Sequence, residues 1–195
     1  LPISYSTRYG FCVERVTAAF DACAFDSMIG LCDHHGHWQV RGASECDVIR
    51  GGILYARWTP WNDVTVESWI YWEKPWHIRV HRIRSARALL SIEGGFCLPD
   101  GQAHSVANER RAHIETTDDF SGLVDLSPHP RSARVHRCLP DTHLLHSETL
   151  LPQLVSGRGP GETLLGCAVI ASPDIARCHA AWNAPLPAIR TLPLP

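Results

Sequence analysis

Residues 64–84 decide the fold, and they read VTVESWIYW (64–72), EKP (73–75) and WHIRVHRIR (76–84). In the first run, the even-numbered residues from Val64 to Trp72 share one face and the odd-numbered residues between them share the other, which is the period of a β-strand. In the second run, His77, Arg79 and His81 share one face. The triplet Arg-Ile-Arg at 82–84 interrupts that alternation and predicts a β-bulge. The stretch therefore predicts an antiparallel hairpin that turns at residues 73–75.

Short strand-like runs recur along most of the chain, with turn residues between them. Residues 143–154 are predicted to be irregular or briefly helical, residues 157–161 to form a loop, and residues 173–181 to form a short terminal helix. The fold class predicted is all-β, an antiparallel β-sandwich with at most short helices near the C-terminus. Residues 1–184 are predicted to form one domain, and residues 185–195 a Pro-rich extended tail. The further strands predicted are 3–13, 27–32, 38–41, 48–49, 53–58, 86–95, 103–106, 112–116, 121–124, 131–138 and 162–171.

Composition narrows the classes of partner. Apolar residues make up 45% of the 195 residues, which suffices for a core without disulfides. Charged residues make up only 19%, so we expect another domain to cover part of the surface. A net charge of −2 favours no nucleic-acid partner. The chain has no apolar run of about 20 residues, so no membrane partner is predicted.

The eight cysteines are scattered and form no C-x-x-C pair, which favours buried, reduced thiols over a disulfide framework. This usage, and the lack of a signal peptide, predict a cytoplasmic protein. The chain begins Leu1-Pro2-Ile3 without an initiator Met, so we expect a segment of a longer protein. No cofactor is predicted.

The densest histidine group is Asp33-His34-His35-Gly36-His37. Three histidines and a carboxylate are potential ligands of a divalent metal, but adjacent side chains on a tight turn seldom converge on one ion. A solvated turn is the favoured interpretation, and no metal site is predicted. A small metalloprotein built on His34, His35 and His37 is the minor alternative.

Two groups are candidates for binding a ligand. The row His77, Arg79 and His81 has the donors to hold a carboxylate, or it forms a structural polar face, with Glu67 as an internal partner. The second group is aromatic: indole rings stack on sugar rings, and they also pack well in a core. Trp58 and Trp61 flank Pro60 and are expected on a loop between strands. The candidate substrate-binding residues are Trp58, Trp61, Trp76, His77, Arg79 and His81.

No sequence motif indicates catalysis by this segment alone. The chain has no G-x-S-x-G, no Walker A loop and no dinucleotide-binding glycine pattern. Two carboxylates can act together on a glycosidic bond, but their separation is not readable from sequence. Candidates for such a pair are Glu45, Asp47, Asp63, Glu67 and Glu93.

Several stretches together resemble the C-terminal β-sandwich of a bacterial and fungal carbohydrate-active family, a domain of unknown function. The most specific match is residues 75–83, Pro-Trp-His-Ile-Arg-Val-His-Arg-Ile, and residues 57–61, Arg-Trp-Thr-Pro-Trp, match as well. Other matches are residues 6–11, 26–28, 44–46 and 93–96, with weaker ones at 150–152 and 161–169.

The resemblance implies a supersandwich-like β-domain joined to an N-terminal α/α-toroid, in the manner of heparinase II/III-type lyases. It links the parent protein to glycoside hydrolysis, with exo-β-glucuronidase as the named activity. The function it implies is a domain of a glycoside hydrolase or lyase-like enzyme that acts on uronic-acid-containing glycans. This segment would support the toroid and form one wall of its cleft. A non-catalytic carbohydrate-binding or scaffolding module is the alternative.

Overall fold

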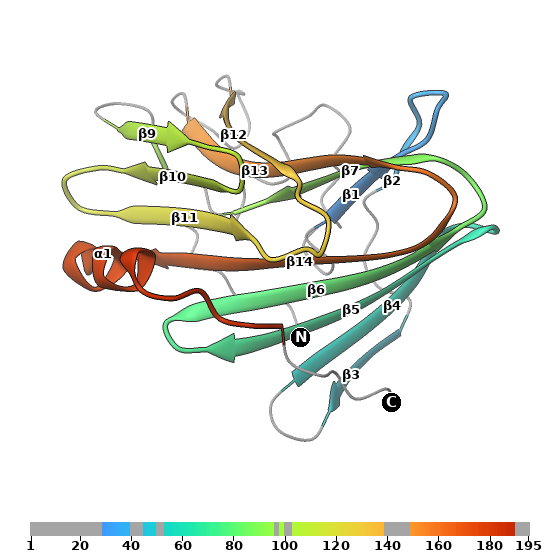
Figure 1. Ribbon diagram of the computed structural model, residues 1–195, viewed down its shortest axis with the longest axis horizontal. Helices are drawn as coiled ribbons and strands as arrows, with labels where there is room; N and C mark the ends of the chain where they lie inside the picture. The colour runs from blue at the N-terminus through green and yellow to red at the C-terminus, as the bar shows by residue number, and fades with distance from the viewer. Residues whose placement is uncertain are drawn as a thin grey trace.

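The computed structural model describes residues 29–39, 45–49, 53–95, 98–99, 103–138 and 149–189. These residues form strands and one helix, α1 (Figure 1). The strands are β1 (Ile29–Cys32), β2 (Trp38–Gln39), β3 (Glu45–Ile49), β4 (Ile53–Trp61), β5 (Val64–Glu73), β6 (Trp76–Ser85), β7 (Leu89–Gly94), β8 (Leu98–Pro99), β9 (His104–Ala107), β10 (Arg111–Glu115), β11 (Phe120–Asp125), β12 (Ser132–Cys138), β13 (Thr149–Arg158) and β14 (Gly161–Ser172), and the helix α1 is Ile175–Asn183.

The strands form two antiparallel sheets that stack face to face. The larger, eight-stranded sheet has the order β3-β4-β5-β6-β14-β11-β10-β9. The smaller, six-stranded sheet has the order β12-β13-β7-β1-β2, and β8 also pairs with β13. Figure 1 shows the smaller sheet above β14, β6, β5 and β4 of the larger one, with α1 at the left-hand end. The prediction of an all-β antiparallel sandwich is confirmed.

The β5–β6 hairpin is at the centre of the larger sheet. Its pairing runs without a shift from Val64 opposite Ser85 to Glu73 opposite Trp76. The predicted bulge at residues 82–84 is therefore wrong. Arg82 continues the alternation onto the face that carries Trp69, where its guanidinium lies 5.1 Å from the indole centroid. The aromatic ring, with Glu67 3.5 Å from the guanidinium, accommodates a charge at a position where the sequence pattern favours an apolar residue.

The second half of the chain corrects two further predictions. The part of residues 143–154 that the structure describes belongs to strand β13, although irregular or helical structure was predicted. Pro152, which has no N–H to donate, lies where the pairing of β13 passes from β8 at Leu150 to β7 at Gln153, and its carbonyl accepts a hydrogen bond from Gly95 N at 2.8 Å. The loop predicted at 157–161 is a shorter turn, since β13 runs to Arg158 and β14 starts at Gly161. Gly161 has φ +126°, which side-chain-bearing residues rarely adopt.

The predicted terminal helix is present as α1. Asp174 caps its N-terminus by accepting a hydrogen bond from Arg177 N, and Cys178 and Ala181 are its buried residues. Residues 185–189 follow without regular structure, and the rest of the predicted tail lies outside the described residues, as does the strand predicted at 3–13. The described part of the chain contains no helix that is long and apolar enough to span a membrane.

Apolar side chains fill both faces of the larger sheet. One cluster lies on the face that α1 covers and includes Trp69, Ile78 and Phe120. Separate clusters lie between the two sheets, one around Trp58 and Ile83 and one around Leu123 and Leu154. The two clusters between the sheets do not contain the polar residues of β6 and β7. The charged side chains of the interior therefore form a separate group.

Candidate functional site

The six predicted binding residues lie mostly inside the protein. Trp58, Arg79 and His81 are at most 2% exposed and point between the sheets. Trp76 is 4% exposed and packs on the opposite face, with its ring 6.1 Å from that of Trp182. The described geometry therefore favours the interpretation of His77, Arg79 and His81, here named the β6 row, as an internal polar face. A contribution of these residues to sugar binding stays a prediction.

The surroundings of Trp58 and Trp61 also differ from the prediction. Both belong to strand β4, and Pro60 lies in the same strand instead of in a loop. A register shift between the two tryptophans accommodates the proline, which has no N–H to donate. Trp61 is partly exposed, and the guanidinium of Arg87 lies 5.4 Å from its ring centroid. Of the six candidates, Trp61 thus has the most accessible ring.

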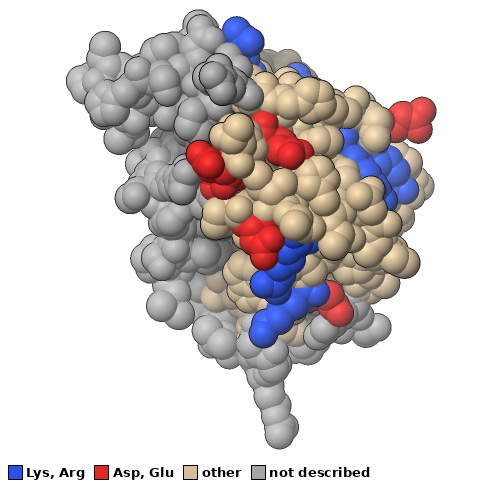
Figure 2. Space-filling view, turned by 90° about the vertical axis from the view of Figure 1, so that its left-hand side faces the viewer, with Lys and Arg blue, Asp and Glu red and all other residues tan. Residues whose placement is uncertain are grey.

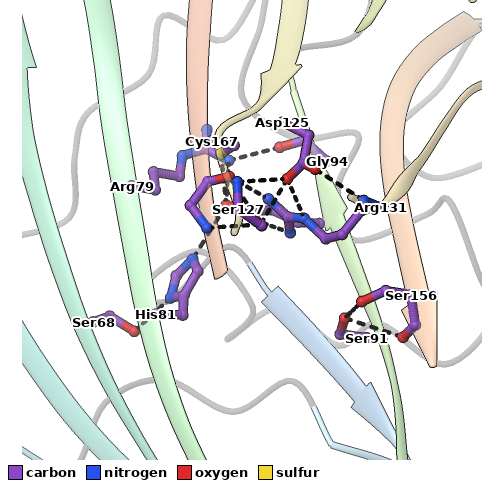
Figure 3. Close-up of polar contacts among 12 residues, drawn as sticks. Ser68, Arg79, His81, Ser91, Gly94, Asp125, Ser127, Arg131, Ser156 and Cys167 are labelled. Atoms are coloured by element: carbon purple, nitrogen blue, oxygen red, sulfur yellow. Dashed lines mark hydrogen bonds and ion pairs between the residues drawn. The ribbon is translucent and has the colours of Figure 1, made fainter. Parts of the chain in front are cut away.

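The polar residues between the sheets form an interior charged cluster, made of Arg79, His81, Glu93, Asp125 and Arg131. All five are at most 1% exposed. They come from both sheets and from the segment that follows β11, and Figure 3 labels four of them, Arg79, His81, Asp125 and Arg131, with dashed lines for the hydrogen bonds and ion pairs. Two arginines face two carboxylates, so their formal charges balance in a region from which water is excluded.

Glu93 is the centre of this cluster. Its Oε2 accepts a hydrogen bond from Arg131 NH1 at 2.6 Å. Its Oε1 accepts from the Cys167 thiol at 2.9 Å and lies 3.1 Å from His81 Nε2. The second ring nitrogen of that histidine lies 2.8 Å from Ser68 Oγ. These contacts connect β7 of the smaller sheet to β5, β6 and β14 of the larger one.

Arg131 links Glu93 to the second carboxylate. Its Nε donates to Asp125 Oδ1 at 2.9 Å, and its NH2 donates to the carbonyl of Gly166 at 2.7 Å. Ser127 donates its hydroxyl to the same Asp125 oxygen at 2.6 Å. Arg79 donates to the carbonyl of Gly94 at 2.6 Å. The cluster thus holds the two sheets in register by directional bonds that apolar contacts do not provide.

The electrostatics of the cluster exclude a role for Glu93 as an acid or base near neutral pH. Burial raises the pKa of its carboxyl, but the contacts with His81, Arg131 and Arg79 outweigh burial and bring the pKa well below its ordinary range. Burial, together with the charge of Glu93, raises the pKa of the Cys167 thiol well above its ordinary value. Both groups keep one protonation state across the physiological range and act as structural partners.

The carboxylates proposed from sequence do not form a catalytic pair in the described residues. Glu67 lies on the face opposite the β6 row, so it is not the internal partner of that row, and it accepts hydrogen bonds from Tyr55 and Arg84 at 3.1 Å. Asp63 holds both a guanidinium Nε and NH2 of Arg87, at 2.8 and 2.7 Å. The side chains of Glu45 and Asp47 lie outside the described set.

The histidine-rich turn at residues 33–37 is stabilised by hydrogen bonds within the turn. Asp33 is buried, and its Oδ1 accepts the backbone N–H groups of His35 and His37 at 2.9 and 3.0 Å. This carboxylate therefore stabilises the turn. Among the described residues, no group of three or more histidine, cysteine or acidic side chains is placed to hold a metal ion.

Beside the turn of the β5–β6 hairpin, an exposed tryptophan covers His77, the end residue of the polar row. Trp72 is 64% exposed and stacks on His77, with ring centroids 5.0 Å apart and planes inclined by 24°. His77 is 2% exposed, and neither of its ring nitrogens has a hydrogen-bond partner among the residues that the structure describes. Burial first, and then the charge of Arg79, lower the pKa of His77 to about 3, so the ring is neutral. An exposed indole therefore lies on a buried, neutral imidazole.

A pocket of about 240 Å³ adjoins Trp72. It lies between the β5–β6 turn, the last residues of β14 and the first turn of α1, and we name it the hairpin-end pocket. Its lining residues are Trp72, Lys74, Pro75, Ile170, Ala171, Ser172, Arg177 and Cys178.

The sequence analysis missed two residues of the cluster, Asp125 and Arg131, and the main residue of the pocket, Trp72. Asp125 and Arg131 come together only because β11 and the segment after it lie across the sandwich from β7. Trp72 belongs to the regular alternation of β5, and its exposure depends on how far the opposite sheet extends. A position directly before the turn residues was the available signal for Trp72, because strand ends are often left uncovered.

Comparisons with known proteins place the chain in a family and relate its fold to solved structures. Residues 2–193 match the family model described as the DUF2264 C-terminal domain. No curated protein sequence matches the chain significantly.

The similar solved structures include two whose titles name a heparinase III and a heparan sulfate lyase. A heparinase III gene product superposes with a TM-score of 0.57 at 7% identity, over 78% of this chain and 25% of that one. Heparan sulfate lyase HepC from Pedobacter heparinus superposes with a TM-score of 0.56 at 10% identity, over 78% and 24% of the two chains. At such low identity the likeness is one of fold, and the chain spans about a quarter of the length of these lyases.

Proposed function

Because the chain belongs to the DUF2264 C-terminal domain family, we propose that it is the β-sandwich domain of a larger enzyme that acts on uronic-acid-containing glycans. In this proposal it supports an N-terminal α/α-toroid and forms one wall of the cleft in which the glycan binds. The observation that carries the proposal is the likeness of its fold to about a quarter of two much longer polysaccharide lyases.

The reaction we propose first is elimination, because the titles of the similar structures name a heparinase and a heparan sulfate lyase. Hydrolysis, which the sequence resemblance implied, is the other chemistry open to a uronic-acid-containing glycan. The two reactions differ in their products, since elimination leaves an unsaturated uronate and hydrolysis does not.

The catalytic groups are expected to come mainly from the partner domain. Glu93 and Asp125 are bound to Arg131, and Asp63 is bound to Arg87, so each of these carboxylates already has a structural partner. Acid–base catalysis needs a group within reach of the substrate that changes its protonation state. For the same reason, a non-catalytic sugar-binding or scaffolding module is the second candidate function.

The decisive experiment compares three proteins: the full-length parent, residues 1–195 alone, and the parent without this segment. Each is incubated with heparan sulfate, with another uronate-containing polysaccharide and with a neutral β-glucan. We expect only the full-length protein to act, only on the acidic glycans, and to release products with the ultraviolet absorbance of an unsaturated uronate. Activity of the parent without this segment would contradict its role as a wall of the cleft.

A variant of Arg79 separates a direct from an indirect role of the β6 row. Arg79 is fully buried and bound to the carbonyl of Gly94, so Arg79→Ala should reduce activity on acidic glycans through the fold, in proportion to the loss of folded protein. Trp61→Ala, at the most exposed of the predicted rings, is the companion variant. A loss of activity in Arg79→Ala protein that remains fully folded would instead support direct contact with the sugar carboxylate.

A further inference from the structure

We propose that the hairpin-end pocket is a subsite for one acidic sugar residue, with Trp72 as its stacking surface and Lys74 and Arg177 as the groups that bind its carboxylate. The proposal rests on the proposed function, to which it adds a position and the residues that hold the sugar. The site lies at the surface and is distinct from the buried β6 row that the sequence pattern indicated.

The first argument is the exposure of the Trp72 side chain. Its 64% exposure is the largest among the large hydrophobic side chains that the structure describes. The indole stacks on the buried ring of His77, with planes inclined by 24°, so this contact supports the exposed ring from one side. A large, oriented, exposed aromatic ring is a binding surface for a ring-shaped ligand with apolar C–H faces.

The second argument is the charge around the pocket. Lys74, the chain's single lysine, and Arg177 both line it. Both are exposed, and neither is within ion-pair distance of a carboxylate in the part of the chain that the structure describes. The lining residues include no acidic side chain, although Glu73 and Asp174 are next to lining residues in the sequence. Two unpaired cations beside an aromatic ring suit a carboxylate on a sugar.

The third argument is size. At about 240 Å³, the pocket is smaller than the roughly 300–1,000 Å³ clefts that enclose drug-sized ligands, which suits a single sugar unit. Figure 2 shows the end of the molecule that carries α1, where acidic and basic side chains occur in small separate groups on a largely uncharged surface. Such a surface favours local recognition of one anionic group over general attraction of a polyanion.

The test is ligand-observed saturation-transfer NMR on the full-length protein with three probes: glucuronic acid, glucose and acetate. If the site needs both the ring and the charge, glucuronic acid should bind more strongly than either of the other two. Trp72→Ala should weaken glucuronic acid binding by about tenfold, because it removes the stacking surface. Lys74→Gln and Arg177→Gln should weaken it by about two- to fivefold each, as expected for exposed charge pairs.

Matched controls keep the result specific to this pocket. Leu164→Ala removes another exposed apolar side chain of the larger sheet, and Arg134→Gln removes an exposed charge from the smaller one. Neither should change binding. Salt should weaken the binding of glucuronic acid to the wild type and have less effect on the Lys74→Gln/Arg177→Gln double variant, because exposed charges are screened.

Two outcomes overturn the subsite. One is no binding of glucuronic acid to the wild type, and the other is binding that Trp72→Ala and the double variant leave unchanged. The proposed function is judged separately, by cleavage of acidic polysaccharides by the same protein preparations. Cleavage with unaltered probe binding in the variants would refute the subsite alone, whereas a wild type that binds glucuronic acid but cleaves no acidic glycan would refute the enzymatic proposal.

Discussion

At the scale of single residues, the interior charged cluster explains why ionised side chains are retained between two sheets. A buried charge is unfavourable unless it has a partner of opposite sign and hydrogen bonds for its remaining groups. Glu93 meets this condition through Arg131, the Cys167 thiol and His81. Each partner comes from a different strand or segment, so one side chain connects several elements.

Replacing Glu93 tests this role directly. Glu93→Gln keeps the shape of the side chain but leaves Arg131 and Arg79 with one carboxylate instead of two. The free energy of unfolding should fall by about 3–5 kcal/mol, the usual effect of leaving a buried charge unpaired. Urea unfolding followed by circular dichroism measures it.

The matched control is Glu162→Gln, at an exposed carboxylate that pairs with Arg84 at 2.8 Å. Its effect on stability should be much smaller, since water replaces the lost partner. Equal effects of the two variants would contradict the structural importance of the interior cluster. Because the pKa of Glu93 is lowered on folding, its stabilisation should be present above its ordinary value of 4.5 and decline as the pH falls below that value.

His77 predicts a second pH dependence. Folding lowers its pKa from 6.5 to about 3, chiefly through burial, with the charge of Arg79 adding to the effect and Glu93 opposing it. Between these values the unfolded chain binds a proton that the folded chain does not, so stability falls as the pH drops from 6.5 toward 3. His77→Phe keeps the ring on Trp72 and should reduce that slope by up to about 1.4 kcal/mol per pH unit.

Urea titrations of the wild type and of His77→Phe at several pH values between about 4 and 8 would measure this difference in slope. Above neutral pH the two stability curves should run parallel. An unchanged slope below pH 6.5 would show that His77 titrates normally in the folded protein.

At the scale of elements, the two faces of the larger sheet serve different purposes. The inner face carries the charged cluster, and the outer face carries an apolar cluster that α1 covers. The helix approaches β11 closely at Gly122, where a β-carbon would lie only 2.9 Å from ring atoms of both Phe120 and Trp182. A residue without a side chain is therefore needed for Trp182 to pack on the strand.

Gly122→Ala should displace α1 and lower the stability by about 1–3 kcal/mol, as overpacking of a filled site does. Hydrogen exchange of the α1 amides should become faster, while exchange in the β5–β6 hairpin should change little. Gly157→Ala is the control, because a β-carbon there would meet no atom within 4 Å. Wild-type exchange in Gly122→Ala would mean that the helix does not depend on this contact.

At the scale of the whole molecule, the sandwich seals its described free thiols from solvent. Cys32, Cys167 and Cys178 are free and buried, and their pKa values are raised chiefly by burial, to about 11 for Cys178. Because the thiolate is the reactive form, these cysteines should resist a thiol reagent at mildly alkaline pH while the protein is folded.

Peptide-level mass spectrometry after brief alkylation, with and without denaturant, measures this protection. The three cysteines should be modified rapidly only in denaturant. Rapid modification of Cys167 in the folded protein would be inconsistent with a closed space between the sheets, because this thiol contacts Glu93 at the centre of the interior cluster.

The sequence alone determined most of the strands, with β13 as an exception, together with the β5–β6 hairpin, the sandwich class and the terminal helix, because period-two alternation and turn residues are local properties of the chain. It did not determine which face of β6 is covered, because the same alternation of His77, Arg79 and His81 suits either a surface row or an interior one. Only the tertiary structure decided this, by placing Glu93 of β7 opposite the row and by leaving Trp72 beyond the cover of the other sheet. Contacts between strands far apart in the sequence set the burial of each charge, and burial decides whether a polar side chain binds a ligand or supports the fold.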